Sequence, residues 1–177
     1  MLLFSDRSIS TMVHGLILSG GAMMAMAAVL FALTTMTTPN GAPASRRPSS
    51  ALAWLSVFMT VLLWLSVLMG TYKVFPLYRA TPPEGLASLA AYPRAMLMAS
   101  GETRWLHAFA MEIKEHMPWI AAMLTTAVAF VTVRYRATLL ADAALRRVAA
   151  SLTAVAFAIV AFVALLGVFV NKVAPLQ

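Results

Sequence analysis

Three histidines, at positions 14, 107 and 116, are the side chains of this chain best suited to chemistry. Two neutral imidazoles that face each other from different helices can hold a b-type haem, and small residues beside them make room for the macrocycle. Gly15 follows His14 directly, so one side of such a site is present. The other side is His116 or His107, and the same imidazoles suit a quinone.

Two other constellations are weaker. Glu112, Glu115 and His116 have the spacing of the Glu-x-x-His ligand pairs of di-iron helical bundles. Those sites also need carboxylates from the other helices, and the apolar stretches of this chain contain none. The thirteen methionines could bind cuprous copper, but methionine is also a flexible filler of apolar packing, which is our interpretation. We therefore expect no metal site, and we identify no catalytic set of residues.

The elements that must position these residues are membrane helices. Of the 177 residues, 62% are hydrophobic and 11% charged, whereas a soluble domain has about 25% charged residues. This composition excludes a soluble or disordered chain. Four stretches reach the roughly 20 apolar residues that a bilayer requires or come close to it. They are residues 9–33, 51–74, 117–133 and 148–170, and they predict an all-α integral membrane protein with a single domain over residues 1–177.

The charges indicate an orientation. Both short loops between these stretches are basic, and by the positive-inside rule they are cytoplasmic. Both termini and the long segment 75–116 are then extracytoplasmic, and we expect the inner membrane of a bacterium. The net charge of +7 is explained by topology and lipid headgroups, so we expect no nucleic-acid partner. The loop cations are Arg46, Arg47, Arg134, Arg136, Arg146 and Arg147.

The long outer segment contains the most informative stretch. Prolines from position 76 onward predict that the second helix ends near Val74. Thr103–His116 has an apolar stripe and two polar ones, which predicts an amphipathic helix at the membrane surface with Trp105 and Trp119 as anchors. Pro118 restricts the residue before it. We therefore expect this interfacial helix to join the third transmembrane helix at a bend there.

Two functions are compatible with this sequence. In the first, the protein is an accessory subunit of a respiratory or photosynthetic electron-transfer complex and has no catalytic activity of its own. In the second, it is a redox subunit that binds b-type haem or a quinone near the outer face through His14 and His116 or His107. The expected partners are other membrane subunits, lipid and an extracytoplasmic electron carrier or quinone.

Overall fold

The computed structural model describes residues 5–36 and 46–175, and within these ranges every regular element is a helix. Four helical runs there are long and apolar enough to cross a membrane. This confirms the all-α fold that the composition predicts. Residues 37–45, which form most of the predicted turn between the first two spans, lie outside the described residues. The four runs are Asp6–Thr35, Ser50–Arg79, Leu106–Arg134 and Ala143–Val173.

Three of these runs contain a segment of the wider π-helix. Such segments are rare inside α-helices and often occur at functional sites. The first run comprises α1 (Asp6–Met12), the π-helical η1 (Val13–Ser19) and α2 (Gly20–Thr35). The second comprises α3 (Arg46–Met69), the π-helical η2 (Gly70–Val74) and α4 (Phe75–Arg79). The others are α5 (Pro93–Ala99), the π-helical η3 (Leu106–Met111) with α6 (Glu112–Arg134), α7 (Arg136–Ala141) and α8 (Ala143–Val173).

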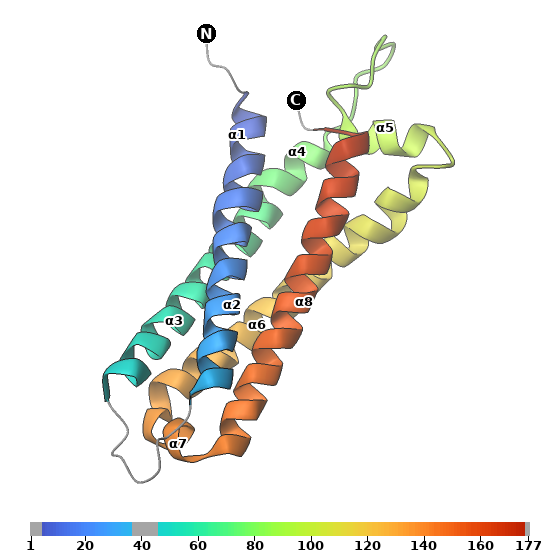
Figure 1. Cartoon of the computed structure of the whole chain (residues 1–177). Coiled ribbons are helices and arrows are strands. Elements are labelled where there is room, and N and C mark those ends of the chain that lie inside the picture. The colour runs from blue at the N-terminus through green and yellow to red at the C-terminus, as the bar shows by residue number, and fades with distance from the viewer. Residues whose placement is uncertain (1–4, 37–45, 176–177) are drawn as a thin grey trace.

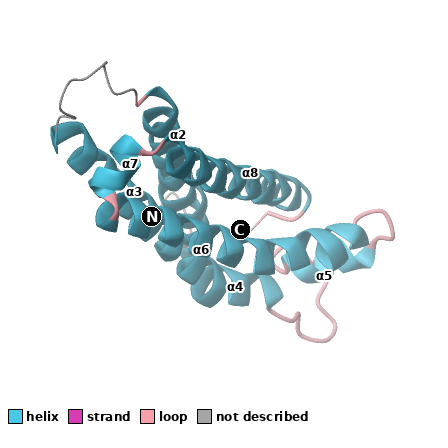
Figure 2. Ribbon diagram, turned by 90° about the horizontal axis from the view of Figure 1, so that it is seen from below, coloured by secondary structure: helices cyan, strands magenta, loops and turns pink. Residues whose placement is uncertain are grey.

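The runs alternate in direction, so the start of α1 and the end of α8 lie at one end of the bundle, together with α4 and α5 (Figure 1). We call this the terminal end, and the opposite end, where α7 lies, the α7 end. α2 packs against α3 and α8, and α6 packs against the same two helices. Seen along the bundle, α5 lies to one side (Figure 2). An arrangement in which α1 begins and α8 ends at the same end is compatible with the predicted topology. Which side of the membrane this end faces stays a prediction.

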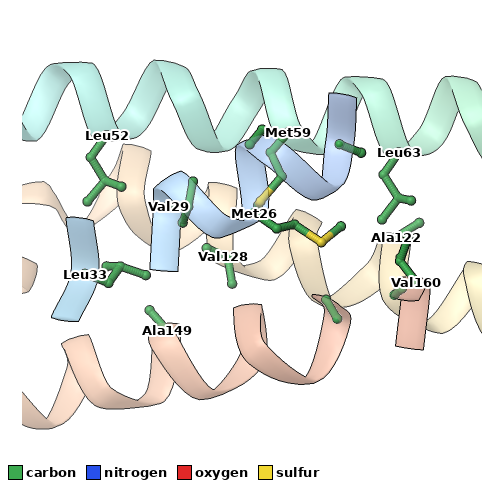
Figure 3. Packing of buried hydrophobic residues seen from close by; sticks show 14 of the residues in the cluster. Met26, Val29, Leu33, Leu52, Met59, Leu63, Ala122, Val128, Ala149 and Val160 are labelled. Atoms are coloured by element: carbon green, nitrogen blue, oxygen red, sulfur yellow. The ribbon is translucent and has the colours of Figure 1, made fainter. Parts of the chain in front are cut away.

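The main core lies where α2, α3, α6 and α8 meet (Figure 3). Met26 and Met59 are fully buried at its centre, where flexible thioether chains fill irregular gaps between helices. Ala22, Ala122 and Ala156 are also fully buried. Small side chains let helix backbones approach closely, which is how helices associate in lipid.

A second, smaller core lies at the terminal end. It joins α4, α5 and η3 to the last turns of α8, and it is separate from the main core. Apolar side chains of the outer segment are thereby buried against α8. The buried members are Tyr78, Leu97, Leu106, Ala110, Met111, Leu166, Val170 and Ala174.

Hydroxyl groups connect α3 to α6 inside the bundle. The side chains of Ser56 and Thr132 are hydrogen-bonded to each other, and both residues are fully buried. One turn farther along, Thr60 Oγ1 donates to the carbonyl of Thr125 at 3.0 Å. In the interior of a helical bundle, where water is absent, polar side chains form hydrogen bonds with neighbouring helices instead. They fix how α3 and α6 are aligned along their length.

The predicted separate helix over Thr103–His116 is wrong, whereas a bend at Pro118 stays a prediction. The helix runs without a break from Leu106 through Pro118 to Arg134. The reason is tertiary: Leu106 and Ala110 of the apolar stripe pack against α8 and α4 in the second core, although Phe109 of the same stripe is 57% exposed. A proline removes one helical hydrogen bond, and helices packed on both sides of a transmembrane helix make that loss tolerable.

The predicted end of the second helix near Val74 is also wrong, because helical structure continues through α4 to Arg79. Pro76 lies in the first turn of α4, directly after the π-helical η2. At that position the backbone has already left regular α-helical bonding, so the missing donor costs little. Tyr78, which is buried in the second core, holds the extra turn in place.

Candidate functional site

A cavity of about 670 Å³ lies between η1, η2, α6 and α8 in the terminal half of the bundle. Pockets for small molecules typically have volumes of about 300–1,000 Å³, with mostly apolar walls and a few polar groups. This cavity has that character, since aliphatic side chains of all four helical runs line it. The polar and ionisable side chains on its wall include His14, Ser66, Tyr78, Lys114, Glu115 and His116.

His14 enters the cavity from η1. Its Nδ1 lies 2.9 Å from the main-chain carbonyl oxygen of Ser66, and this oxygen can only accept a hydrogen bond. Nδ1 therefore carries the proton and donates it, which leaves the lone pair on Nε2 of the neutral ring. The Ser66 hydroxyl also contacts Ser19 Oγ at 2.7 Å, so η1 and α3 are joined at this level. No described residue bonds Nε2, which makes it available to a ligand.

Gly70 makes the position of His14 possible. A Cβ added to Gly70 would lie 2.7 Å from Cε1 of the His14 ring and 3.3 Å from each of its nitrogens. Carbon atoms in normal contact are about 3.5–4.0 Å apart. The imidazole therefore lies directly on the backbone of η2, where only glycine leaves space for it.

Lys114 enters the cavity from α6, and its amine reaches α8. A Cβ added to Gly167 would lie 2.8 Å from Lys114 Nζ, so the amine rests against the α8 backbone at that glycine. Among the described residues, no carboxylate or other acceptor bonds this amine. An unpaired ammonium group among apolar side chains is costly, so it marks a candidate ligand contact.

His116 lies at the rim of the same cavity. Its side chain is 72% exposed, and Nδ1 lies 2.8 Å from the main-chain carbonyl of Glu112, one turn earlier in α6. The Glu112 carboxylate is 3.9 Å from the same nitrogen. As in His14, the Nδ1 hydrogen is directed to a carbonyl, and Nε2 is left as the atom that can bind a ligand. Glu115 lies next to His116 on the cavity wall.

His107 lies apart from the cavity. Its Nδ1 contacts the Tyr78 hydroxyl at 2.9 Å, and its Nε2 accepts from Arg94 Nε at 3.4 Å. Both ring nitrogens therefore have partners. The structure brings His14 and His116 to one cavity and places His107 in a second polar cluster behind Tyr78.

Lys114, Gly70 and Gly167 belong to this site but are not among the residues that the sequence singles out. One signal for Lys114 was present, because it stands only three residues before the apolar stretch of the third span. The two glycines gave no local signal, since each is required by a side chain from a different helix.

Within the described residues, no group of three or more His, Asp or Glu side chains is placed to hold a metal ion. The functional argument therefore rests on the cavity and on the hydrogen-bonding directions of its polar groups. No protein-family model, no curated protein sequence and no solved structure matches this chain.

Proposed function

We propose that this protein is an integral membrane subunit that binds a quinone-type ligand in the cavity at the terminal end. The observation that carries this proposal is the pairing of an acceptor, His14 Nε2, with an unpaired donor, Lys114 Nζ, between apolar walls. Quinones and quinols have an apolar ring and tail with oxygen atoms at opposite edges of the ring. Their size and polarity match the cavity.

The two polar groups differ in what they offer a ligand. The lone pair of His14 Nε2 accepts a hydrogen bond from a quinol hydroxyl, while the Lys114 ammonium donates to a ring oxygen. The carbonyl of Ser66 keeps the Nδ1 hydrogen in place, so the His14 ring presents its acceptor without changing tautomer. A fatty acid would use Lys114 alone, because a carboxylate has no hydrogen for His14.

Haem is the second candidate. His14 and His116 both line the cavity, and each directs its Nδ1 hydrogen to a main-chain carbonyl. This is the usual arrangement of a histidine whose Nε2 binds a metal. The pair would hold the iron of a b-type haem, which would supply one-electron redox chemistry when bound. His107 is not part of this proposal, because both of its nitrogens have partners.

We also propose that the protein works within a larger membrane-bound electron-transfer complex. Quinones and haems exchange electrons with other carriers, so a binding subunit needs neighbours. The bundle presents large apolar side chains outward, among them Met24, Trp54 and Phe31 with 77%, 74% and 69% exposure. Such surfaces suit lipid and the helices of neighbouring subunits. The inner membrane of a bacterium, with both termini outside, remains the proposed location.

The test is a titration of the purified protein in lipid nanodiscs with decylubiquinone. Trp119 lines the cavity, so a bound quinone should quench its fluorescence. Its ring packs edge to face on Trp64, with the ring centroids 5.7 Å apart. Trp119→Phe identifies how much of the signal comes from this tryptophan. We expect saturable quenching by the quinone in the unaltered protein.

Lys114→Met tests its contact with decylubiquinone. His14→Ala is tested with the reduced form, decylubiquinol, because His14 Nε2 accepts a hydrogen bond and only the quinol has a hydroxyl to donate. A hydrogen bond to a charged group contributes about 1.5–3 kcal/mol, so Lys114→Met should weaken binding by about 10- to 100-fold. Lys73→Met is the matched control, because Lys73 is exposed and lies outside the cavity. Equal affinity of the Lys114 and Lys73 variants would contradict the proposal, as would tighter binding of oleate than of the quinone.

An optical difference spectrum of oxidised minus reduced protein decides between the two ligands. A haem band in the purified protein that is lost in His14→Ala and in His116→Ala would favour the haem. A spectrum without such a band, combined with saturable quinone binding, would favour the quinone.

A further inference from the structure

A chain of hydrogen bonds leads from the outer segment to the cavity wall. Arg94 Nε donates to His107 Nε2 at 3.4 Å, and His107 Nδ1 lies 2.9 Å from the hydroxyl oxygen of Tyr78. Tyr78 is 3% exposed and is one of the residues that line the cavity. The three residues come from α5, η3 and α4, so the folded chain alone brings them together.

The direction of each bond follows from the chemistry of its groups. A guanidinium has no acceptor, so Arg94 must be the donor and His107 Nε2 must be the acceptor. A neutral imidazole that accepts at Nε2 carries its hydrogen at Nδ1. His107 Nδ1 therefore donates to Tyr78, and the tyrosine oxygen is the acceptor in that bond. The hydroxyl hydrogen of Tyr78 must point elsewhere.

Among the described residues, no acceptor bonds the hydroxyl hydrogen of Tyr78. The tyrosine ring is held in place by stacking on Phe75, with centroids 6.2 Å apart and an interplanar angle of 17°. Arg79 covers the Phe75 ring, with its guanidinium carbon 5.1 Å from the ring centroid. Because Tyr78 lines the cavity, a ligand bound there could accept this hydrogen.

We propose that the Tyr78 hydroxyl donates a hydrogen bond to a carbonyl oxygen of the ligand, and that His107 and Arg94 set the direction of this donor. This inference rests on the proposed quinone site, and it adds a third polar contact to His14 and Lys114. His107, which sequence analysis selected as a cofactor ligand, is here a positioning residue that never touches the ligand. Its role explains why a histidine stands outside the cavity with both nitrogens occupied.

The experiment compares Tyr78→Phe with Tyr72→Phe in nanodiscs. Both changes remove one hydroxyl from neighbouring turns of the same helical run, but Tyr72 is 73% exposed and does not line the cavity. Loss of one neutral hydrogen bond should weaken decylubiquinone binding by about 3- to 10-fold in the Tyr78 variant and leave the Tyr72 variant unchanged.

Infrared difference spectra of isotope-labelled decylubiquinone measure the carbonyl stretching frequency of the ligand. A purely structural role of Tyr78 would leave this frequency unchanged. A carbonyl that accepts a hydrogen bond absorbs at lower frequency than a free one. We expect one carbonyl band to return to higher frequency in Tyr78→Phe. In His107→Leu, which alters no cavity residue, that band should broaden because the hydroxyl is no longer oriented.

The outcomes separate this inference from the proposed function. Saturable binding with the same affinity and carbonyl bands in the Tyr78 and Tyr72 variants would overturn the role of Tyr78 and leave the quinone site standing. Failure of the unaltered protein to bind decylubiquinone would overturn both. If Tyr78→Phe does not fold, His107→Leu decides: an unchanged carbonyl band would refute the role of His107 as the group that orients the donor.

Discussion

Gly70→Ala is the substitution whose effect the structure specifies most closely. The new Cβ would lie 2.7 Å from Cε1 of His14, whereas carbon atoms in contact are about 3.5–4.0 Å apart. Taking the lower limit, the ring must withdraw by about 0.8 Å (3.5 − 2.7). Its Nδ1 is bonded to the Ser66 carbonyl at 2.9 Å, so the ring cannot move this far without straining or losing that bond.

The expected loss of stability combines three contributions. Overpacking of a filled site costs about 1–3 kcal/mol. A strained or lost hydrogen bond adds about 0.5–1.5 kcal/mol. Alanine in place of glycine in a helix offsets up to about 1 kcal/mol. We therefore expect Gly70→Ala to lower the free energy of unfolding by about 0.5–3.5 kcal/mol.

The assay is reversible unfolding in mixed detergent micelles, followed by circular dichroism. Gly20→Ala is the matched control, because Gly20 is also a glycine inside one of the four long apolar helical runs. There the nearest atom to an added Cβ, the carbonyl oxygen of Gly15, is at an ordinary distance of 3.8 Å. The Gly20 variant should be as stable as the unaltered protein or slightly more stable. If both variants unfold at the same detergent fraction, the close contact between His14 and Gly70 is refuted.

Three further predictions concern other parts of the molecule. Gly167→Ala should leave stability nearly unchanged, because the flexible amine of Lys114 can move away from the new Cβ, but it should weaken quinone binding several-fold in the same titration. Thr60→Val removes a hydrogen bond to α6 and should lower the free energy of unfolding by about 0.6 kcal/mol, the average for such bonds between membrane helices. A decrease above about 2 kcal/mol would contradict this prediction. Single cysteines at Ala87 and Ala143, exposed at opposite ends of the bundle, should differ in intact cells. A membrane-impermeant maleimide should label only the first, and the reverse pattern would invert the orientation.

The number of long helices and their apolar character follow from the sequence alone, because the thickness of a bilayer sets the length of an apolar helix. This is a local property of each stretch, so no tertiary contact is needed to predict it. The limits of the third and second runs do depend on tertiary contacts. Leu106 and Tyr78 extend these runs beyond their apolar stretches because both are buried in the second core against α8.

The sequence also identified histidines at one end of the bundle as the candidate site, and alternating helices place them there. It could not decide which of them share a cavity. His107 and His116 lie nine residues apart on one helical run, yet His107 has both nitrogens bonded by Tyr78 and Arg94 while His116 reaches the cavity rim. Those partners come from other elements, so their positions are unknown until the outer segment folds.

The cavity itself is a product of tertiary structure. Lys114 is a candidate ligand contact only because its amine rests on Gly167, more than fifty residues later in the chain. Gly70 is required only because His14, from another helix, lies against it. Apolar length and charge are properties of single segments and can be counted along the sequence. A hydrogen-bond direction or the space for a ring depends on which atoms meet, and only the packed helices decide that.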